Sequence, residues 1–327
     1  MPLILALIAR IFYCKSCTNH QPRRSLYIHV SHGLGNRLRA YASAAALAKK
    51  TNRQLVLVWE PDVHLNATFH QLFTNEIQVH NTSVLGKVGT LKHTRVYDYI
   101  TYPVDWQERK PVLDSENVDI YVYTAYSVIG TTRVTPVDIS RELRALETIQ
   151  TVEEIIDRFK RSLAASELRI SDLFGVHIRM QNNLQIDIPG IERLKTANPS
   201  SITSRMRATA ETRNLCHVKS FEQNIRRRLE KNHSAHFFIT TDSRDVLPYL
   251  RNAFGEEKVL SIPDSSESAC YGRESRQLKC IQFALADLII LANTRELILS
   301  LESSYSEVAQ KFAHRKKASI GCSRSHG

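Results

Sequence analysis

The amino-acid sequence predicts an α/β protein built from two Rossmann-like domains that face each other across a cleft. Apolar runs of strand length alternate with segments of helical period, which is the pattern of repeated strand–helix units. The alternation occurs once in each half of the chain, on either side of a helical segment that ends near residue 165. A length of 327 residues also suits two domains.

The first domain is expected over residues 24–165. The helix that follows its first strand carries small residues along one face. Residues 61–135 are expected to be mostly loop, with one clear strand. We predict strands at 25–30, 54–59 and 118–123, and helices at 35–50 and 152–165.

The second domain is expected over residues 166–327 and repeats the same rhythm. A polar stretch over 182–216 interrupts it, and long loops in compact domains are usually functional or mobile. We predict strands at 171–179, 235–241, 258–262 and 296–301, and helices at 218–230, 245–253, 277–293 and 303–315.

The charge balance points to an anionic ligand. Lysine and arginine number 44 against 33 acidic residues, which gives a net charge of +11. Nucleic acid is not expected, because its recognition calls for dense basic stripes with stacking aromatic residues. The basic runs at 226–228 and 314–317 are interpreted as solvated faces.

Residues 1–23 are expected to be a leader or a truncated signal-anchor. Their apolar stretch spans about a dozen residues, whereas a membrane-spanning helix needs roughly 20. Membrane contact is expected only through this segment. An ER or Golgi lumen is the favoured location, with the cytoplasm as the alternative. Sequons that permit glycosylation occur at Asn66, Asn81 and Asn232.

The six cysteines are too few for a disulfide scaffold. Cys14 and Cys17 form a Cys-x-x-Cys pair without a second matching pair, so a zinc site is not expected. Cys270 and Cys280 would close a loop if the compartment is oxidising.

A glycine-containing turn, "SHGLGNRLRA", lies between the first predicted strand and helix. Gly33 and Gly35 permit a tight turn, and a helix N-terminus offers free N–H groups to an anion. The stretch is a poor dinucleotide fingerprint, because Leu38 occupies the third glycine position. Glu60 after the next strand keeps an NAD site as an alternative, and an ordinary strand-to-helix turn is another.

Two predicted strands of the second half end in polar residues. His177 and Arg179 close an apolar strand, where a guanidinium needs an anionic partner. That partner is either a ligand phosphate or a structural carboxylate. Asp242 follows another strand, and it either caps the next helix or contacts a ligand in the cleft.

Two further sets of polar residues complete the candidate site. Asp287 lies within an apolar helix, so its carboxylate needs a partner, either the N–H edge of a guanine or an internal cation. Ser303, Ser304 and Ser306 lie where a strand becomes a helix, and they either bind a diphosphate or cap that helix.

Four segments, taken together, resemble the GDP-fucose-dependent fucosyltransferases, a superfamily that includes α1,6-fucosyltransferases, nodulation fucosyltransferases and protein O-fucosyltransferases. They are "GLGNRLRAYASAAALAKKTNRQLVLVWEPD", "GVHIRM", "FFITTDS" and "ALADLIILANTRELILSLESSYSEVA", in the family's order and at similar spacing. The resemblance implies a GT-B-like fold with the donor in the second domain and the acceptor on the first. It implies inverting, metal-independent fucose transfer to a glycan or protein, with GDP-fucose as a substrate and no cofactor.

The resemblance also implies roles for the motif residues. Arg179 would hold the donor diphosphate and Asp242 would contact the donor. Asp287 would recognise guanine. The pyrophosphate-binding serine corresponds to Ser304 and less surely to Ser303 or Ser306.

Asn36 matches the asparagine of the corresponding turn in the O-fucosylating branch, and we count it with the catalytic residues. Met180 is a departure, since the α1,6 enzymes have a second arginine there. Asp187 is our candidate for the general base, with a plain loop acid as the alternative.

Three other interpretations stay open at this point. The chain either binds a GDP-sugar without activity, uses a different GDP-sugar, or is an NAD-linked oxidoreductase. A metal is not expected, because no Asp-x-Asp pair occurs in the sequence. The nearest substitute is the cluster of Glu60, Asp62, His64 and His70, which we assign to an acceptor-side loop or a solvated turn.

Overall fold

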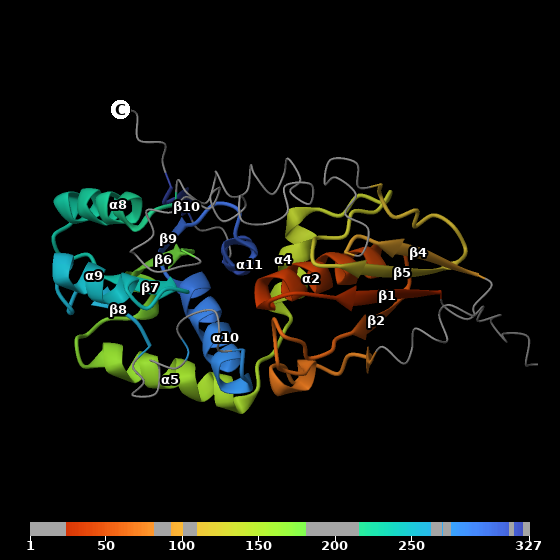
Figure 1. The fold of residues 1–327 in the computed structure, drawn as a ribbon, viewed down its shortest axis with the longest axis horizontal. Coiled ribbons are helices and arrows are strands. Elements are labelled where there is room, and N and C mark those ends of the chain that lie inside the picture. The colour runs from red at the N-terminus through yellow and green to blue at the C-terminus, as the bar shows by residue number, and fades with distance from the viewer. Residues whose placement is uncertain are drawn as a thin grey trace, which may run out of the picture.

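The computed structural model contains two five-stranded sheets that lie next to each other, each covered by helices (Figure 1). The structure describes residues 24–81, 93–100, 110–180, 216–262, 270, 276–313 and 317–322. Every strand pairing within the two sheets is parallel, and the strands alternate with helices along the chain. The predicted α/β architecture of two Rossmann-like halves is confirmed.

The first sheet has the order β3-β2-β1-β5-β4. In its central strand, Leu26, Ile28 and Val30 alternate with half-buried residues and face the core, as period-two alternation predicts. The alanine-rich α2 packs on this core, and its small side chains allow a close approach. The strands are β1 (Ser25–Val30), β2 (Gln54–Val58), β3 (Val79–His80), β4 (Thr94–Asp98) and β5 (Asp119–Thr124), and the helices are α2 (Leu34–Lys50), η1 (Phe69–Gln71) and α4 (Pro136–Arg144).

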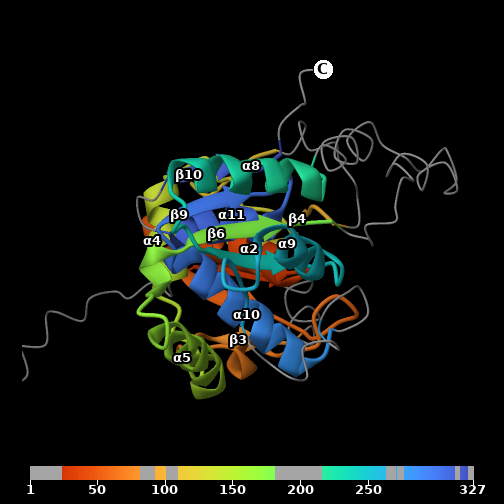
Figure 2. The same ribbon diagram turned by 90° about the vertical axis from the view of Figure 1, so that its left-hand side faces the viewer.

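The second sheet has the order β10-β9-β6-β7-β8, so β6 is its centre. β6 is buried on both faces, which explains why its sequence is a continuous apolar run. Figure 2 shows α8 on one side of this sheet and α10 and α5 on the other. The strands are β6 (Phe174–Ile178), β7 (Phe237–Thr241), β8 (Val259–Leu260), β9 (Glu296–Leu299) and β10 (Lys317–Ile320), and the helices are α5 (Gln150–Ala164), η3 (Ile170–Asp172), α8 (Val218–Lys231), α9 (Val246–Phe254), α10 (Leu278–Asn293) and α11 (Ser304–Phe312).

The structure corrects some of the expected boundaries. The stretch 61–135 contains β3 and β4 in addition to the expected strand, and residues 136–144 form a helix that the sequence did not indicate. The last helix ends at Phe312 and is followed by β10. The unpredicted strands β3, β4 and β10 are short edge strands with polar residues, so they lack the apolar run that marks a central strand. The polar stretch 182–216 lies almost wholly outside the described residues.

The helix α5 belongs to the first half by sequence but packs on the second half. Its Phe159 ring lies 4.9 Å from the Phe238 ring of β7, and α5 runs along α10. The predicted domain boundary at residue 165 therefore follows a helix that already contacts the second sheet.

Two disulfides connect elements of the second half. Cys270–Cys280 is the pair that the sequence suggested. Cys216–Cys322, which the sequence did not indicate, joins the segment that precedes α8 to the segment that follows β10. Cys14 and Cys17 lie outside the described residues. No helix in the part of the chain that the structure describes has both the length and the apolar character needed to cross a membrane.

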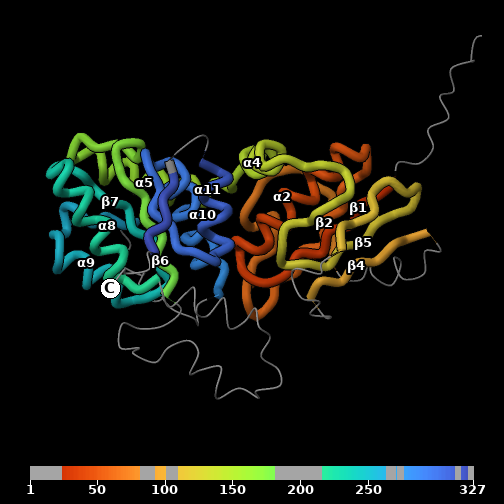
Figure 3. The backbone as a smooth tube through the Cα atoms, turned by 90° about the horizontal axis from the view of Figure 1, so that it is seen from above, coloured from red at the N-terminus to blue at the C-terminus, as the bar shows by residue number. Residues whose placement is uncertain are grey.

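The two halves meet where α2 and α11 begin. Figure 3 shows α10 and α11 between the second sheet and α2. A Cβ atom at Gly35 would lie 2.7 Å from the backbone nitrogen of Tyr305, so only glycine allows the two helix N-termini to come this close. Gly33 has open space around its Cα and a φ of −73° that any residue can adopt.

We predict that Gly35→Ala destabilises the protein by about 1–3 kcal/mol, because the methyl group meets rigid backbone rather than a movable side chain. Gly33→Ser is the matched control and should change the free energy of unfolding by less than about 0.5 kcal/mol, because Gly33 is the N-cap of α2 and serine is a good N-cap residue. Urea unfolding of both variants measures this. Equal stability of the two variants would contradict the packing role of Gly35.

Candidate functional site

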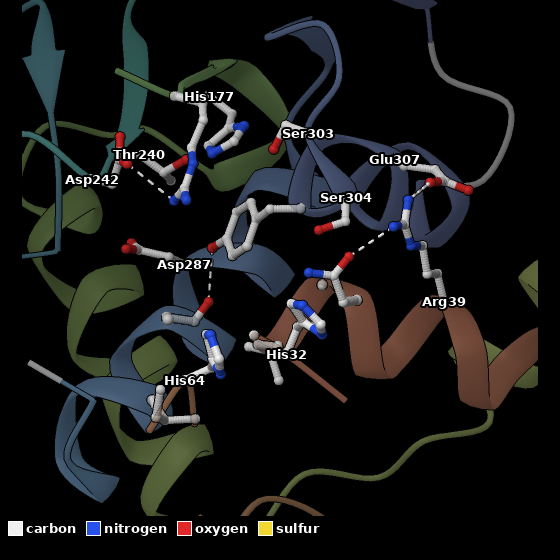
Figure 4. Close-up of a pocket in the computed structure, with 18 of the residues that line it drawn as sticks. His32, Arg39, His64, His177, Thr240, Asp242, Asp287, Ser303, Ser304 and Glu307 are labelled. Carbon is white, nitrogen blue, oxygen red and sulfur yellow. Dashed lines mark hydrogen bonds and ion pairs between the residues drawn. The ribbon is translucent and has the colours of Figure 1, made fainter. Parts of the chain in front are cut away.

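A pocket of about 680 Å³ lies between the two halves of the molecule. It opens at the carboxyl ends of β6 and β7, the edge at which α/β sheets bind ligands. The β1–α2 turn forms the opposite wall, and α10 and the start of α11 complete the pocket (Figure 4). Nine of the predicted site residues line it: Gly33, Gly35, Asn36, His177, Arg179, Asp242, Asp287, Ser303 and Ser304.

Arg179 forms an ion pair with Asp242 at the end of β6. The distance from Arg179 Nη1 to Asp242 Oδ2 is 3.0 Å, and one-third of the arginine side chain is exposed to the pocket side of the sheet. Asp242 Oδ1 accepts a hydrogen bond of 2.8 Å from the backbone N–H of Met180. Asp242 does not cap α9, which begins after Asp245. The carboxylate therefore orients the guanidinium, whose further N–H groups are available to an anionic ligand.

His177 is buried and neutral behind this ion pair. Its Nδ1 lies 2.7 Å from Ser306 Oγ, and its ring lies 4.7 Å from the Tyr305 ring. Burial lowers the pKa of His177 to about 3. His177 borders the pocket, but the contact with Ser306 shows that it also fastens β6 to α11. Ser306, predicted as a ligand-binding serine, is buried in that contact and does not line the pocket.

The start of α11 brings backbone N–H groups to the pocket. Ser303 is the N-cap, and its Oγ accepts a hydrogen bond of 3.4 Å from the backbone N–H of Ser306. Ser304 is the first residue of the helix and lines the pocket. Ser303 therefore caps α11. The N-terminus of this helix supplies partial positive charge to the pocket.

Asp287 faces the pocket from the middle of α10 (Figure 4). It lies near Tyr305, whose hydroxyl donates a 2.8 Å hydrogen bond to the Ala284 carbonyl of the same helix. Burial raises the pKa of Tyr305 well above its usual value, and the negative charge of Asp287 adds to this shift. The carboxylate therefore borders a cavity whose other wall carries positive charge.

Arg39 holds Asn36 in place on the opposite wall. Its Nη2 donates a 2.8 Å hydrogen bond to Asn36 Oδ1, and its Nη1 pairs with Glu307 of α11 at 2.9 Å. Its Nε donates to the Ala125 carbonyl at 2.9 Å. This bridge joins the two halves across the pocket mouth. Arg39 was not among the predicted site residues; its place three residues after Asn36 puts both on one face of the helix, but the sequence does not show its partner Glu307.

Arg37 is fully buried beneath the same wall. Its Nη2 forms an ion pair of 2.8 Å with Asp62, and its Nη1 and Nε donate to the carbonyl oxygens of Glu60 and His32 at 2.6 and 2.7 Å. Two residues of the cluster of Glu60, Asp62, His64 and His70 therefore bind Arg37, Asp62 through its carboxylate and Glu60 through its backbone carbonyl. Among the described residues, no group of three or more histidine, cysteine or acidic side chains is arranged to hold a metal ion.

Sequence comparison finds neither a matching family model nor a matching curated protein. Structural comparison does find relatives. The fold is similar to NodZ α1,6-fucosyltransferase soaked with GDP-fucose, with a TM-score of 0.55 and 16% identity over 89% of this chain and 93% of that one. It is similar to fucosyltransferase NodZ from Bradyrhizobium, with a TM-score of 0.53 and 16% identity over 88% of this chain and 92% of that one. It is also similar to POFUT1 in complex with GDP-fucose, with a TM-score of 0.53 and 12% identity over 92% and 98%.

The chain has the fold of the GDP-fucose-dependent fucosyltransferases. The predicted GT-B-like architecture is thus confirmed. The fucosyltransferase fold also accounts for the second glycine of the β1–α2 turn, because Gly35 serves the packing of α2 against α11 rather than the approach of a dinucleotide.

Asp187, our candidate for the general base of a fucosyltransferase, lies outside the described residues. The structure instead brings two histidines into the wall, His32 and His64, which line the pocket. The sequence analysis placed His64 in the acceptor-side loop and missed His32. The only feature of the sequence that could have indicated His32 as a site residue is its place directly before the Gly-x-Gly turn.

We predict that the neutral state of His177 makes stability depend on pH. The pKa is 6.5 in the unfolded chain and about 3 in the folded protein. Unfolded chains bind a proton that the folded protein excludes, so stability falls as pH drops below 6.5, by up to about 1.4 kcal/mol per pH unit. Urea unfolding at pH 7 and pH 5 should show a smaller fall for His177→Asn than for the wild type. His233→Ala removes an exposed histidine and should keep the wild-type slope. An unchanged slope in His177→Asn would contradict burial of the neutral imidazole.

Proposed function

We propose that the protein is an inverting, metal-independent glycosyltransferase that moves L-fucose from GDP-fucose to a hydroxyl of a glycan or protein. One observation carries the proposal. Arg179 is far in sequence from Asp287 and from the start of α11, but all three border a single pocket. The structural neighbours NodZ and POFUT1 were solved with GDP-fucose, which supports the same donor here. The pocket volume of about 680 Å³ falls in the range of small-molecule sites.

The donor diphosphate would lie between Arg179 and the N-terminus of α11. Charge develops on the β-phosphate oxygen as the bond from the fucose C1 atom breaks. A guanidinium held by Asp242 stabilises this charge without reorganising during the reaction. The free N–H groups at the start of α11 add partial positive charge, so no metal is needed to neutralise the leaving group.

The remaining residues would position the guanine ring of the donor and the acceptor. The Asp287 carboxylate can accept two N–H groups from the edge of a guanine, which favours GDP over UDP. The acceptor would enter along the wall formed by the β1–α2 turn, where Arg39 fixes the side chain of Asn36. Attack from this wall, across the pocket from Arg179, is attack on the face opposite to the leaving group and inverts the configuration at C1.

Two alternatives use the same pocket. An inactive GDP-sugar-binding module would bind the donor without releasing GDP. A transferase for another GDP-sugar would keep the guanine and diphosphate contacts and differ only where the sugar lies. An NAD-linked reaction is less well supported, since the backbone of Tyr305 packs against Gly35, where a dinucleotide would have to approach the turn.

We also propose that the protein works in the ER or Golgi lumen. The disulfides Cys216–Cys322 and Cys270–Cys280 support this location, because disulfides persist in oxidising compartments.

The test is a screen of GDP- and UDP-sugars in excess EDTA with detection of released nucleotide. We expect GDP release from GDP-fucose, without loss on chelation and without gain from Mg²⁺ or Mn²⁺. GDP-fucose binding without release would favour the inactive module, and release from a different GDP-sugar would change the donor. Activity that disappears in EDTA and returns with Mn²⁺ would refute the metal-free mechanism.

We predict that Arg179→Lys lowers turnover of GDP-fucose by a factor on the order of 10²–10³ while the fold is kept, because an ammonium cannot reproduce a planar fork. Arg226→Lys is the matched control, since Arg226 lies on the exposed side of α8 and pairs with Glu222. Its turnover should equal that of the wild type. Wild-type turnover in a folded Arg179→Ala variant would disprove the role of Arg179.

A further inference from the structure

His32 has an unusual backbone conformation for its position in the pocket wall. Its φ is 69°, in the left-handed region that only a few per cent of residues other than glycine adopt, Asn, Asp and His being the most frequent among them. The residue stands between β1 and the N-cap of α2, where a glycine would fit without strain. Strained conformations that persist in folded proteins cluster at functional sites, so the conformation of His32 suggests a functional role for its side chain.

The His32 ring is held on two sides. It stacks on the His64 ring, with centroids 5.0 Å apart and an interplanar angle of 28°. Its Nδ1 lies 3.1 Å from the Oγ of the buried Ser31. Both histidines line the pocket, across from His177 and Asp242 (Figure 4). This contact fits either tautomer of the ring, and in the tautomer whose Nδ1–H donates to Ser31 the lone pair on Nε2 is left for a group in the pocket.

We propose that His32 is the general base that removes the proton from the acceptor hydroxyl, an inference that rests on the proposed fucose transfer. The proton passes from the hydroxyl to Nε2 of His32. The oxygen forms its bond to the fucose C1 atom, and the bond from C1 to the β-phosphate oxygen breaks, with its electron pair leaving on GDP. The wall that carries His32 lies across the pocket from Asp242, the partner of Arg179, so the base and the leaving group lie on opposite sides.

The surroundings keep His32 ready to accept a proton at neutral pH. Burial lowers the pKa of His32 below 6.5, and the neighbouring His64 lowers it further. Arg37 and Arg39 on α2 act in the same direction, while Asp62 in the loop after β2 opposes them. Catalysis by a base of this kind declines as pH falls through its pKa, so the acid limb of the rate lies below pH 6.5.

His64 is better suited to support His32 than to replace it. Its side chain is 54% exposed, and its Nδ1 lies 3.7 Å from the Oδ1 of Asp62. The Asp62 carboxylate is itself fixed by the buried Arg37. His64 is therefore a positioning residue that stacks on the base.

The experiment uses the full chain, GDP-fucose, and two acceptor probes, water and azide. Water must lose a proton to react, whereas azide is already an anion and needs no base. His32→Gly fits the backbone conformation and removes the imidazole. We expect its hydrolysis of GDP-fucose to fall by about 10²-fold or more. Release of GDP in the presence of azide should approach the wild-type rate, with unchanged affinity for GDP. The acid limb of the pH profile should disappear.

Three outcomes overturn the proposal. Hydrolysis within threefold of the wild type in His32→Gly excludes His32 as the base. Equal loss of the water and azide reactions assigns it a structural role. Loss of the water reaction alone in Asp187→Asn, with normal His32→Gly, moves the base to Asp187. If the wild-type protein itself releases no GDP, the proposed function fails together with the role of His32. The activity of the wild type therefore distinguishes failure of the proposed function from failure of the His32 proposal alone.

Two variants serve as controls. His32→Asn tolerates the left-handed conformation but offers no basic nitrogen, so it replaces His32→Gly if the glycine variant fails to fold. It should show the same loss of hydrolysis and the same azide rate. His233→Ala removes an exposed histidine of the second half and should match the wild type with both probes.

Discussion

The close approach of two helix N-termini is the constraint on which the site depends. A Cβ atom at Gly35 would meet the backbone of Ser304 and Tyr305 within 3 Å, so α2 and α11 are packed as tightly as backbone allows. The Arg39–Glu307 ion pair spans the same junction. Because each helix follows the central part of its own sheet, this one contact sets the distance between the two pocket walls. It thereby sets where the proposed acceptor would lie relative to the proposed donor.

The charges of the second half are arranged around a single guanidinium. Arg179 is oriented by Asp242, and the chain after β6 is fixed by a hydrogen bond from the backbone N–H of Arg179 to Ser300 Oγ. Ser300 in turn donates to the His177 carbonyl at 3.0 Å. His177 stays neutral, so it adds no second cation and does not compete with Arg179 for the carboxylate. Arg179 and the α11 N-terminus therefore both contribute positive potential to the pocket, which suits a diphosphate.

The sequence allowed the central strands, most helices and the polar residues at the carboxyl ends of β6 and β7 to be predicted, because these depend on local patterns. A buried parallel strand is a continuous apolar run, and polar residues at its end meet those of the neighbouring strand at one edge. The edge strands β3, β4 and β10 carry no such run. Arg39 and the Cys216–Cys322 disulfide could not be predicted, since their partners lie 268 and 106 residues away and only the packing of the two halves brings them together.

The β1–α2 turn shows how a structural arginine can maintain a strained functional residue. Burying Arg37 has a large desolvation cost, which its three polar partners help to offset. One of these is the His32 carbonyl, so the guanidinium holds the backbone of the residue with positive φ. Another is Asp62, which lies beside His64, the stacking partner of His32. Both histidines are thus positioned by one buried cation.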